Sequence, residues 1–314
     1  MKTVFMGTPD FALPVLEGLL SGNYQLVGVY TRPDQPVGRG RIPASPPVKT
    51  YALSRGLPVF QPRSLRREEA VQELASLQPE VIVVAAYGRI LPPEALAVPP
   101  RGVLNIHPSL LPKYRGPSPV ITALLDGEAI TGVTVMLMDQ GMDTGDILAQ
   151  RQTAILPHET AGELTPRLFR LGAELLLEVM PRWTAGDLTP VLQDGAMATT
   201  TRLYTKEDGE MDWSLPAADL ERRLRALQPW PGCYTRWEGK LLRILGGAAT
   251  NEQSPASPPG QAVALPRGSA FAVAVATGKG LLGLREVQME GRKAQAVEEF
   301  LRGYPRFAGA RLPS

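Results

Sequence analysis

Residues 3–20 decide the class of fold, and they run TVFMGTPDFALPVLEGLL. The first four, Thr3 to Met6, are mostly apolar and predict a short buried strand, and the turn-forming residues Gly7 to Asp10 follow directly. From Phe11 to about Leu20 the apolar residues recur at helical spacing, which predicts a helix. A strand, a tight turn and a helix in this order are typical of the opening unit of an α/β fold.

The same alternation continues through the first half of the chain. Further strands are predicted at Leu26–Tyr30, Val81–Ala86, Gly102–Ile106, Gly132–Met138 and Ile147–Gln152. Further helices are predicted at Pro47–Arg55, Arg66–Leu77, Pro117–Leu125 and Thr160–Trp183. Because these strands are almost continuously apolar, both faces of the sheet should be covered by helices. The pattern indicates a doubly wound, mostly parallel, Rossmann-like sheet, whose ligands bind at the carboxyl ends of its strands.

A polar, small-residue stretch from Gln193 to Thr205 interrupts this pattern and is typical of a linker. We therefore expect an α/β domain at residues 1–190, a linker at 191–205 and a second domain at 206–314. After a predicted helix at Ala217–Leu227, the second domain contains short apolar segments separated by Gly and Pro. Several short strands at close spacing predict a small β-barrel of the OB type.

The composition excludes several other classes of protein. With 44% hydrophobic and 20% charged residues the chain is typical of a globular protein, and a single cysteine excludes an internal disulfide. No Cys/His spacing suggests a metal site, and no signal peptide or long apolar stretch is visible, so we expect a soluble protein of the reducing cytoplasm. From Lys206 onward the chain holds 15 Lys and Arg against 12 Asp and Glu, which places the basic excess in the second domain.

One predicted strand ends in polar side chains that are suited to catalysis. Asn105 and His107 lie two residues apart, so they project from the same face of the strand toward the predicted ligand crevice. A lone histidine near a strand end is more often structural than catalytic, although a carboxylate could complete a catalytic group. The turn after the next predicted strand supplies three of them, at Asp139, Asp143 and Asp146.

The string Asn-x-His-x-Ser-Leu-Leu-Pro, followed by Asp143 36 residues beyond His107, resembles the folate-dependent formyltransferase family. This resemblance implies that the formyl donor is 10-formyltetrahydrofolate and that Asn105, His107 and Asp143 form the catalytic group. Further residues are implied to bind the folate, some in a stretch that resembles the wall of the family's pterin pocket: Tyr87, Gly88, Ile90, Leu91, Ser109, Leu110, Leu111, Pro112 and Asp139.

The resemblance also gives each catalytic side chain a role. Attack of an amine on a formyl carbon makes the carbonyl oxygen anionic, and hydrogen-bond donors aimed at that oxygen lower the barrier. Asn105 and a protonated His107 are expected to donate, while Asp143 favours the imidazolium and helps to move protons.

The acceptor must be inferred from other segments, because the family shares its catalytic domain among several amines. The loop Thr31–Arg41 is similar to the loop with which formyltransferases of methionyl-tRNA enter the acceptor stem, and it carries Arg39 and Arg41. Segments 204–213 and 228–232 of the second domain resemble the same enzymes. The resemblance implies that the partner is initiator methionyl-tRNA, formylated for translation initiation, and we expect a monomer that binds no membrane. We expect the second domain's Trp213, Trp230 and Trp237 to pack in its core rather than stack on bases.

Other functions stay open at this stage. A sugar-nucleotide or other amine formyltransferase would use the same catalytic group, and a non-catalytic tRNA-binding protein could retain the fold. A nicotinamide-dependent enzyme is disfavoured, because the first turn, Gly7 to Asp10, lacks the Gly-x-Gly-x-x-Gly fingerprint.

Overall fold

A computed structural model describes residues 1–37, 42–252 and 257–314, which form two compact units. The first unit comprises Met1–Pro119, Ala129–Ile155 and Leu164–Thr201. The second comprises Val120–Glu128, Leu156–Glu163 and Arg202–Ser314. No pattern in the sequence indicated that the two short segments before residue 164 belong with the C-terminal part of the chain.

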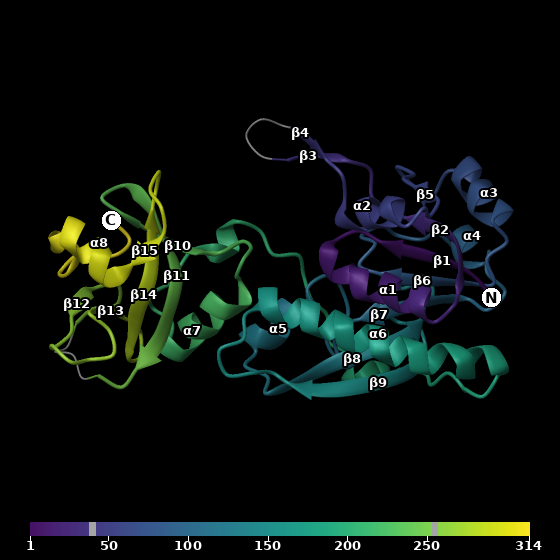
Figure 1. Cartoon of the computed structure of the whole chain (residues 1–314). Helices are drawn as coiled ribbons and strands as arrows, with labels where there is room; N and C mark the ends of the chain where they lie inside the picture. The colour runs from purple at the N-terminus through teal and green to yellow at the C-terminus, as the bar shows by residue number, and fades with distance from the viewer. Residues whose placement is uncertain (38–41, 253–256) are drawn as a thin grey trace. The chain divides into compact units, whose positions relative to one another are not determined.

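The first unit is built on a seven-stranded sheet in the order β5-β2-β1-β6-β7-β8-β9 (Figure 1). The strands are β1 (Lys2–Gly7), β2 (Gln25–Tyr30), β5 (Val59–Phe60), β6 (Val81–Ala85), β7 (Val103–His107), β8 (Ile130–Leu137) and β9 (Ile147–Ala154). The five strands from β5 to β7 are mutually parallel, which confirms the mostly parallel sheet.

Strands β8 and β9 depart from the parallel pattern. β8 runs antiparallel to β7, and β9 runs antiparallel to β8. Only residues 138–146 connect β8 to β9, and a connection this short makes a hairpin, since a parallel crossover needs about a dozen residues or more. The sheet is therefore mixed at this edge, and the end of β8 does not lie beside the end of β7.

Helices cover both faces of the sheet, as the apolar strands predicted. The helices of the first unit are α1 (Leu13–Ser21), α2 (Pro47–Ser54), α3 (Glu68–Ser76), α4 (Pro93–Leu96) and α6 (Ala161–Ala185). The first three residues of α6 belong to the second unit, as does nearly all of α5 (Pro119–Leu125). Phe11, just before α1, packs against Phe169 of α6 with ring centroids 4.9 Å apart and the ring planes tilted by 42°, and Ile106 of β7 packs closely against Gly172 of α6. On the opposite face, Ile82 and Val84 of β6 share a core cluster with residues of α3 and α4. Successive strand residues point to opposite faces, so this arrangement confirms the doubly wound fold.

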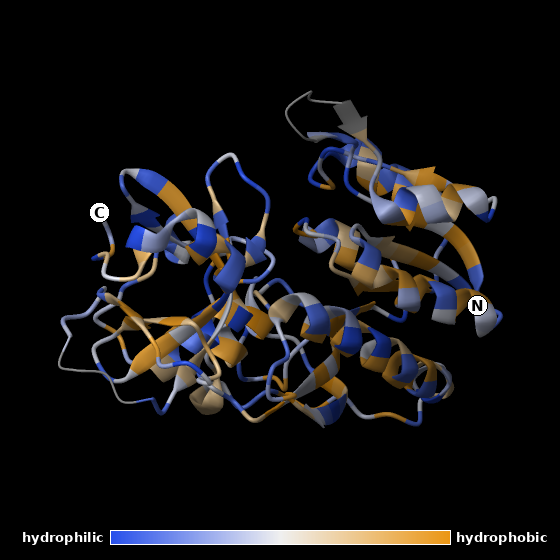
Figure 2. Cartoon of the chain, turned by 60° about the vertical axis from the view of Figure 1, so that its left-hand side comes forward, coloured by the Kyte–Doolittle hydropathy of each residue, from blue (hydrophilic) through white to orange (hydrophobic). Residues whose placement is uncertain are grey.

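The helices are amphipathic, because one face packs on the sheet and the other meets solvent. Figure 2 shows blue and orange residues alternating along them, as expected for helices with one apolar face. Among the helices in the described parts of the chain, none is both long enough and apolar enough to cross a bilayer.

A small hairpin follows β2 and is anchored at its base by Asp34. It consists of β3 (Gln35–Val37) and β4 (Ile42–Ala44), which Figure 1 shows side by side. The Asp34 carboxylate accepts hydrogen bonds from Lys49 Nζ at 2.8 Å and from Gln61 Nε2 at 2.9 Å. The predicted tRNA-contacting residues Arg39 and Arg41 lie outside the described residues.

The second unit contains an antiparallel sheet in the order β10-β11-β14-β13-β12, with β15 also paired to β14. Its strands are β10 (Cys233–Trp237), β11 (Lys240–Thr250), β12 (Ala262–Ala264), β13 (Val273–Ala276), β14 (Leu281–Met289) and β15 (Gln295–Ala296). Besides α5, its helices are α7 (Ala217–Ala226) and α8 (Val297–Gly303). Within the described residues no pairing joins β10 to β12, so closure into a barrel remains a prediction.

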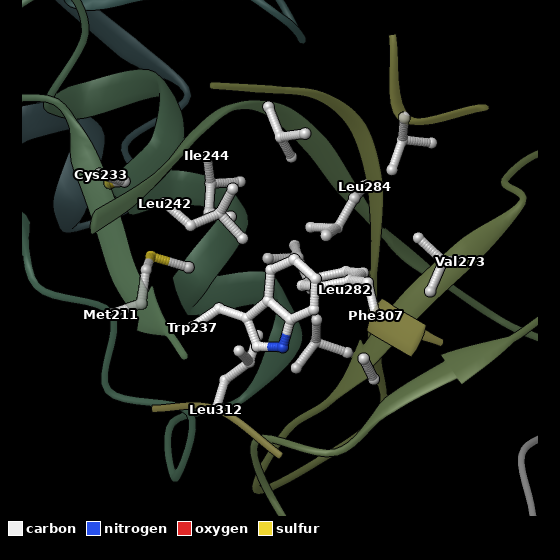
Figure 3. Packing of buried hydrophobic residues seen from close by; sticks show 14 of the residues in the cluster. Met211, Cys233, Trp237, Leu242, Ile244, Val273, Leu282, Leu284, Phe307 and Leu312 are labelled. Carbon is white, nitrogen blue, oxygen red and sulfur yellow. The ribbon is translucent and has the colours of Figure 1, made fainter. Parts of the chain in front are cut away.

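Trp237 lies at the centre of the core of the second unit (Figure 3). Its ring meets Phe300, Tyr304 and Phe307 edge to face, with centroids 5.2 to 5.8 Å apart. Trp213 is also buried, so core packing is confirmed for both side chains. The same prediction is wrong for Trp230, which is 59% exposed, because it lies in the surface turn between α7 and β10.

Candidate active site

His107, at the end of β7, is paired with Asp143 inside the first unit. The imidazole is only 4% exposed, and its Nδ1 lies 3.6 Å from Asp143 Oδ2. Its Nε2 lies 2.9 Å from the carbonyl oxygen of Tyr114. A carbonyl oxygen only accepts, so Nε2 carries a proton, and Nδ1 is the nitrogen that can gain or lose one.

Burial determines the charge of this imidazole. The pKa of His107 is lowered because burial disfavours the charged ring, and this effect outweighs the attraction of Asp143 and the hydrogen bond to Tyr114. The sequence led us to expect a protonated His107 that donates to the reacting oxygen. The structure favours the neutral ring instead, with Nδ1 free to accept a proton beside a carboxylate that stabilises the resulting imidazolium.

Asn105 provides a hydrogen-bond donor next to this pair. It lies two residues before His107 in β7, so both side chains project from the same face of the sheet. Its half-buried amide forms no hydrogen bond with any group in residues 1–37, 42–252 or 257–314. The amide is therefore available to a ligand that lies against His107.

Asp143 reaches this point by a route that the sequence did not indicate. Because β8 is antiparallel to β7, its end lies beside the beginning of β7, where the N–H of Met138 donates to the carbonyl of Val103 at 2.8 Å. The loop 138–146 must therefore fold back to bring the carboxylate to His107. Asp143 adopts a φ of 54°, a left-handed conformation that is uncommon for a residue other than glycine.

Asp139 holds this loop in shape. Its carboxylate accepts hydrogen bonds from Thr144 Oγ1 at 2.7 Å and from the N–H of Gly141 at 3.0 Å. The side chain is exposed and its hydrogen bonds are local to the loop. The predicted folate contact of Asp139 remains a prediction.

The loop after the Asn-x-His motif supplies two backbone groups to the site. The carbonyl of Tyr114 accepts from His107, and the N–H of Gly116 donates to Asp143 Oδ2 at 2.7 Å. Gly116 has a φ of 105°, and a Cβ there would lie 2.9 Å from Thr201 Oγ1, so only glycine fits without strain. Sequence patterns did not indicate these two backbone groups, although a glycine nine residues beyond His107 was a usable signal.

The predicted folate-binding stretch that follows His107 is largely internal. Ser109 is 1% exposed and its hydroxyl donates to the carbonyl of Lys113 at 2.7 Å. Leu111 is also buried, whereas Leu110 and Pro112 are half-buried. Ser109 therefore shapes the loop, and Leu110 and Pro112 present more surface to a ligand.

The second predicted folate segment divides in the same way. Tyr87 and Leu91 are buried in the core of the first unit, and burial raises the pKa of Tyr87 to about 12. Gly88 has a φ of 71° and its carbonyl accepts from the Arg32 guanidinium, whereas Ile90 is 70% exposed. Tyr87 and Leu91 support the segment from inside, and Ile90 is the member free to contact a ligand.

The arrangement is suited to transfer of an acyl group to an amine. An amide donor stands next to a neutral imidazole whose free nitrogen faces a carboxylate, and a backbone N–H fixes that carboxylate. A donor can stabilise an oxyanion, and a neutral imidazole can accept a proton from a nucleophile.

Both parts of the chain match known families. Residues 1–180 match the family described as Formyl transferase, and residues 204–305 match the one described as Formyl transferase, C-terminal domain. A methionyl-tRNA formyltransferase of Roseiflexus castenholzii is 48% identical over 313 residues, which cover 99% of each chain. One of Chloroflexus aggregans is 48% identical over 96% of this chain and 97% of its own.

Solved structures share the fold at lower identity. An N-formyltransferase of Helicobacter canadensis, in complex with folinic acid and dTDP-3-aminofucose, matches 90% of this chain and 99% of its own with a TM-score of 0.65 and 18% identity. HypX of Aquifex aeolicus, in complex with tetrahydrofolic acid, matches 98% of this chain and 47% of its own with a TM-score of 0.63 and 18% identity. At this identity the likeness concerns the fold alone.

Proposed function

This chain belongs to the formyl transferase family, and we propose on that premise that it transfers the formyl group of 10-formyltetrahydrofolate to the amino group of initiator methionyl-tRNA. The observation that carries the proposal is the buried His107, 3.6 Å from Asp143, with the amide of Asn105, which has no partner in the described part of the chain, two residues before it in the same strand. The product is formylmethionyl-tRNA, which serves translation initiation.

The three side chains divide the work of the transfer. The amino nitrogen attacks the formyl carbon, a C–N bond forms, and the carbonyl oxygen takes the negative charge that Asn105 stabilises by donating a hydrogen bond. His107 Nδ1 accepts the proton that the attacking nitrogen loses, and Asp143 stabilises the imidazolium. The intermediate then collapses, the bond to N10 of the folate breaks, and the same proton passes to that nitrogen, which leaves as tetrahydrofolate.

The formyl donor is proposed to lie against two segments of the first unit. Its pterin ring is assigned to the backbone of Gly88 and the exposed side chain of Ile90, supported by Tyr87 and Leu91. The stretch Ser109–Pro112 and Asp139 complete the proposed folate-binding set. A charged residue at Ile90 should then weaken folate binding, and an unchanged dissociation constant would remove Ile90 from the pocket.

The identity of the acceptor is supported by the second unit and by the hairpin after β2. The relatives named as methionyl-tRNA formyltransferases align with the whole chain, so the similarity includes the basic C-terminal part. Arg39 and Arg41 are proposed to contact the acceptor stem. The variant Arg39→Ala should raise the KM for the tRNA and leave folate affinity unchanged, and added salt should weaken tRNA binding steeply.

A parallel assay of acceptors tests this function. Purified protein is given radiolabelled 10-formyltetrahydrofolate with methionyl-tRNA, glycinamide ribonucleotide or an amino-sugar nucleotide, and transfer of label to each acceptor is measured. Label on methionyl-tRNA alone is the expected result. Transfer of label to the amino sugar with none to the tRNA would mean that the acceptor is an amino sugar instead of methionyl-tRNA. Binding of tRNA without any transfer would mean that the protein is non-catalytic.

A further inference from the structure

A strap of residues 191–201 lies along the first unit and is bonded at both ends. At its start, Val191 exchanges backbone hydrogen bonds of 2.8 and 2.9 Å with Ile147. At its end, the N–H of Arg115 donates to the carbonyl of Thr199 at 2.9 Å, and the N–H of Thr201 donates to the carbonyl of Arg115 at 2.7 Å. The sequence predicted a linker here, but these bonds tie the strap to the first residue of β9, directly after the Asp143 loop, and to the loop that carries Arg115.

Gln193 is a residue of the strap whose side chain turns inward. Its neighbours Val191 and Leu192 are 61% and 81% exposed, whereas Gln193 is partly buried. Its Nε2 donates to the carbonyls of Asp143 at 2.9 Å and Gly145 at 2.7 Å. Its Oε1 accepts from Arg115 Nε at 3.0 Å and from Nη2 at 2.9 Å.

These four bonds use the whole capacity of a carboxamide, which has two donors and two accepting lone pairs. They also fix its orientation, because carbonyls only accept and a guanidinium only donates. No other uncharged side chain of this length offers two hydrogen-bond donors and two accepting lone pairs at once. The position is therefore chemically demanding, which is unusual for a linker.

The bonds of Gln193 join the two loops that build the catalytic pair. One loop carries Asp143. The backbone of Asp143 adopts the left-handed conformation, and its carbonyl oxygen accepts a hydrogen bond from Gln193. The other carries Arg115, which lies between the carbonyl that binds His107 Nε2 and the N–H that binds Asp143 Oδ2. A shift of either loop would change the approach of Asp143 to His107 Nδ1.

We propose that Gln193 is a positioning residue for the transfer: it locks the Asp143 loop to the Arg115 loop and so sets the distance between Asp143 and His107. The inference deepens the proposed function and rests on it for its kinetic consequences. Because Gln193 acts through Asp143 and Arg115 and is not assigned to bind either substrate, its loss should lower kcat and leave both KM values nearly unchanged.

The test uses the full-length chain with Gln193→Ala and the isosteric Gln193→Glu, and with Leu192→Ala as the matched control. Gln193→Glu keeps an acceptor for Arg115 but places a carboxylate oxygen against the carbonyls of Asp143 and Gly145, so it should be at least as impaired as Gln193→Ala. Both should lose about ten- to a hundredfold in kcat, the scale expected for a small misplacement of a catalytic group. Leu192→Ala should retain wild-type kcat, because that side chain is exposed.

A second measurement does not depend on activity. The ring of His107 is titrated by NMR in the wild type and in both Gln193 variants. The groups that face this ring are Asp143 and the carbonyl of Tyr114, so release of the Asp143 loop should remove part of the attraction that favours the charged ring and lower the pKa of His107 further.

The outcomes separate the two proposals. A lower kcat at unchanged KM, together with a shifted His107 titration in a folded variant, supports the inference. A kcat within about twofold of wild type, or a loss of kcat with an unchanged titration, overturns it. If the wild type transfers no formyl group, the proposed function fails, and the titration alone still decides whether Gln193 positions Asp143.

Discussion

Replacement of Asn105 by alanine gives the sharpest test of the catalytic assignment. The amide is half-buried, lies on the same face of β7 as His107, and has no hydrogen-bond partner among the described residues. Removal of one oxyanion donor costs about 10² to 10³ in rate, or about 2.7 to 4 kcal/mol of transition-state stabilisation. We expect Asn105→Ala to lose that much in kcat for formyl transfer.

The structure also predicts that this loss comes without unfolding. Because no group in residues 1–37, 42–252 or 257–314 bonds to the Asn105 amide, its removal should leave no buried donor or acceptor there unsatisfied, and the free energy of unfolding should change by about 1 kcal/mol or less. A residue with a structural role would show the reverse pattern, with stability lost and turnover of the folded fraction retained.

The assay measures initial rates of formyl transfer against both substrates, together with urea denaturation of the same preparations. Asn105→Asp removes the donor without changing the size of the side chain and should be at least as slow as Asn105→Ala. Asn251→Ala, a change of the same chemistry at an exposed position of the second unit, serves as the control and should keep wild-type rates. A folded Asn105→Ala protein whose kcat lies within about threefold of wild type would refute the oxyanion role.

Three further predictions follow from other parts of the molecule. The chain contains only two histidines, so the variant His158→Gln leaves His107 as the single imidazole in an NMR titration. Because burial lowers the pKa of His107, the ring should gain its proton only as the pH falls below 6.5. A titration midpoint above 6.5 would contradict the neutral imidazole. The variant Asp34→Asn weakens the base of the β3–β4 hairpin, so it should raise the KM for methionyl-tRNA by up to about fivefold and leave folate affinity unchanged. Steady-state kinetics with each substrate varied in turn would measure this, and a raised KM for the folate with an unchanged KM for the tRNA would contradict it. Denaturant unfolding should show that Trp237→Ala costs about 3 to 5 kcal/mol while Trp230→Ala changes stability by about 0.5 kcal/mol or less, and equal losses would mean that the burial of these two rings is misassigned.

The order of elements was largely predictable because it depends on local patterns. The apolar runs at Thr3–Met6 and Val81–Ala86 became β1 and β6 nearly residue for residue. The spacing of apolar residues likewise located α6 within two residues of its bounds. A strand that is buried on both faces of a sheet is continuously apolar, so the sequence alone predicted a sheet that is covered on both faces.

The direction of β8 was not predictable in this way, because an antiparallel strand buried on both faces has the same composition as a parallel one. The exposure of Trp230 was missed for a related reason. Its neighbours in sequence are Pro229 and Pro231, and nothing in that string tells whether the turn presents its ring to the core or to solvent.

The sequence by itself placed Asn105 and His107 on one face of one strand, since alternation along a strand is a local rule. It also suggested Asp143, through the resemblance of a motif. Only the tertiary structure decided how Asp143 reaches the imidazole, that burial lowers the pKa of this ring, and that Gln193, 50 residues away in the chain, bonds the backbone of Asp143. Burial and long-range hydrogen bonds depend on which segments meet in space, and no local pattern of residues contains that information.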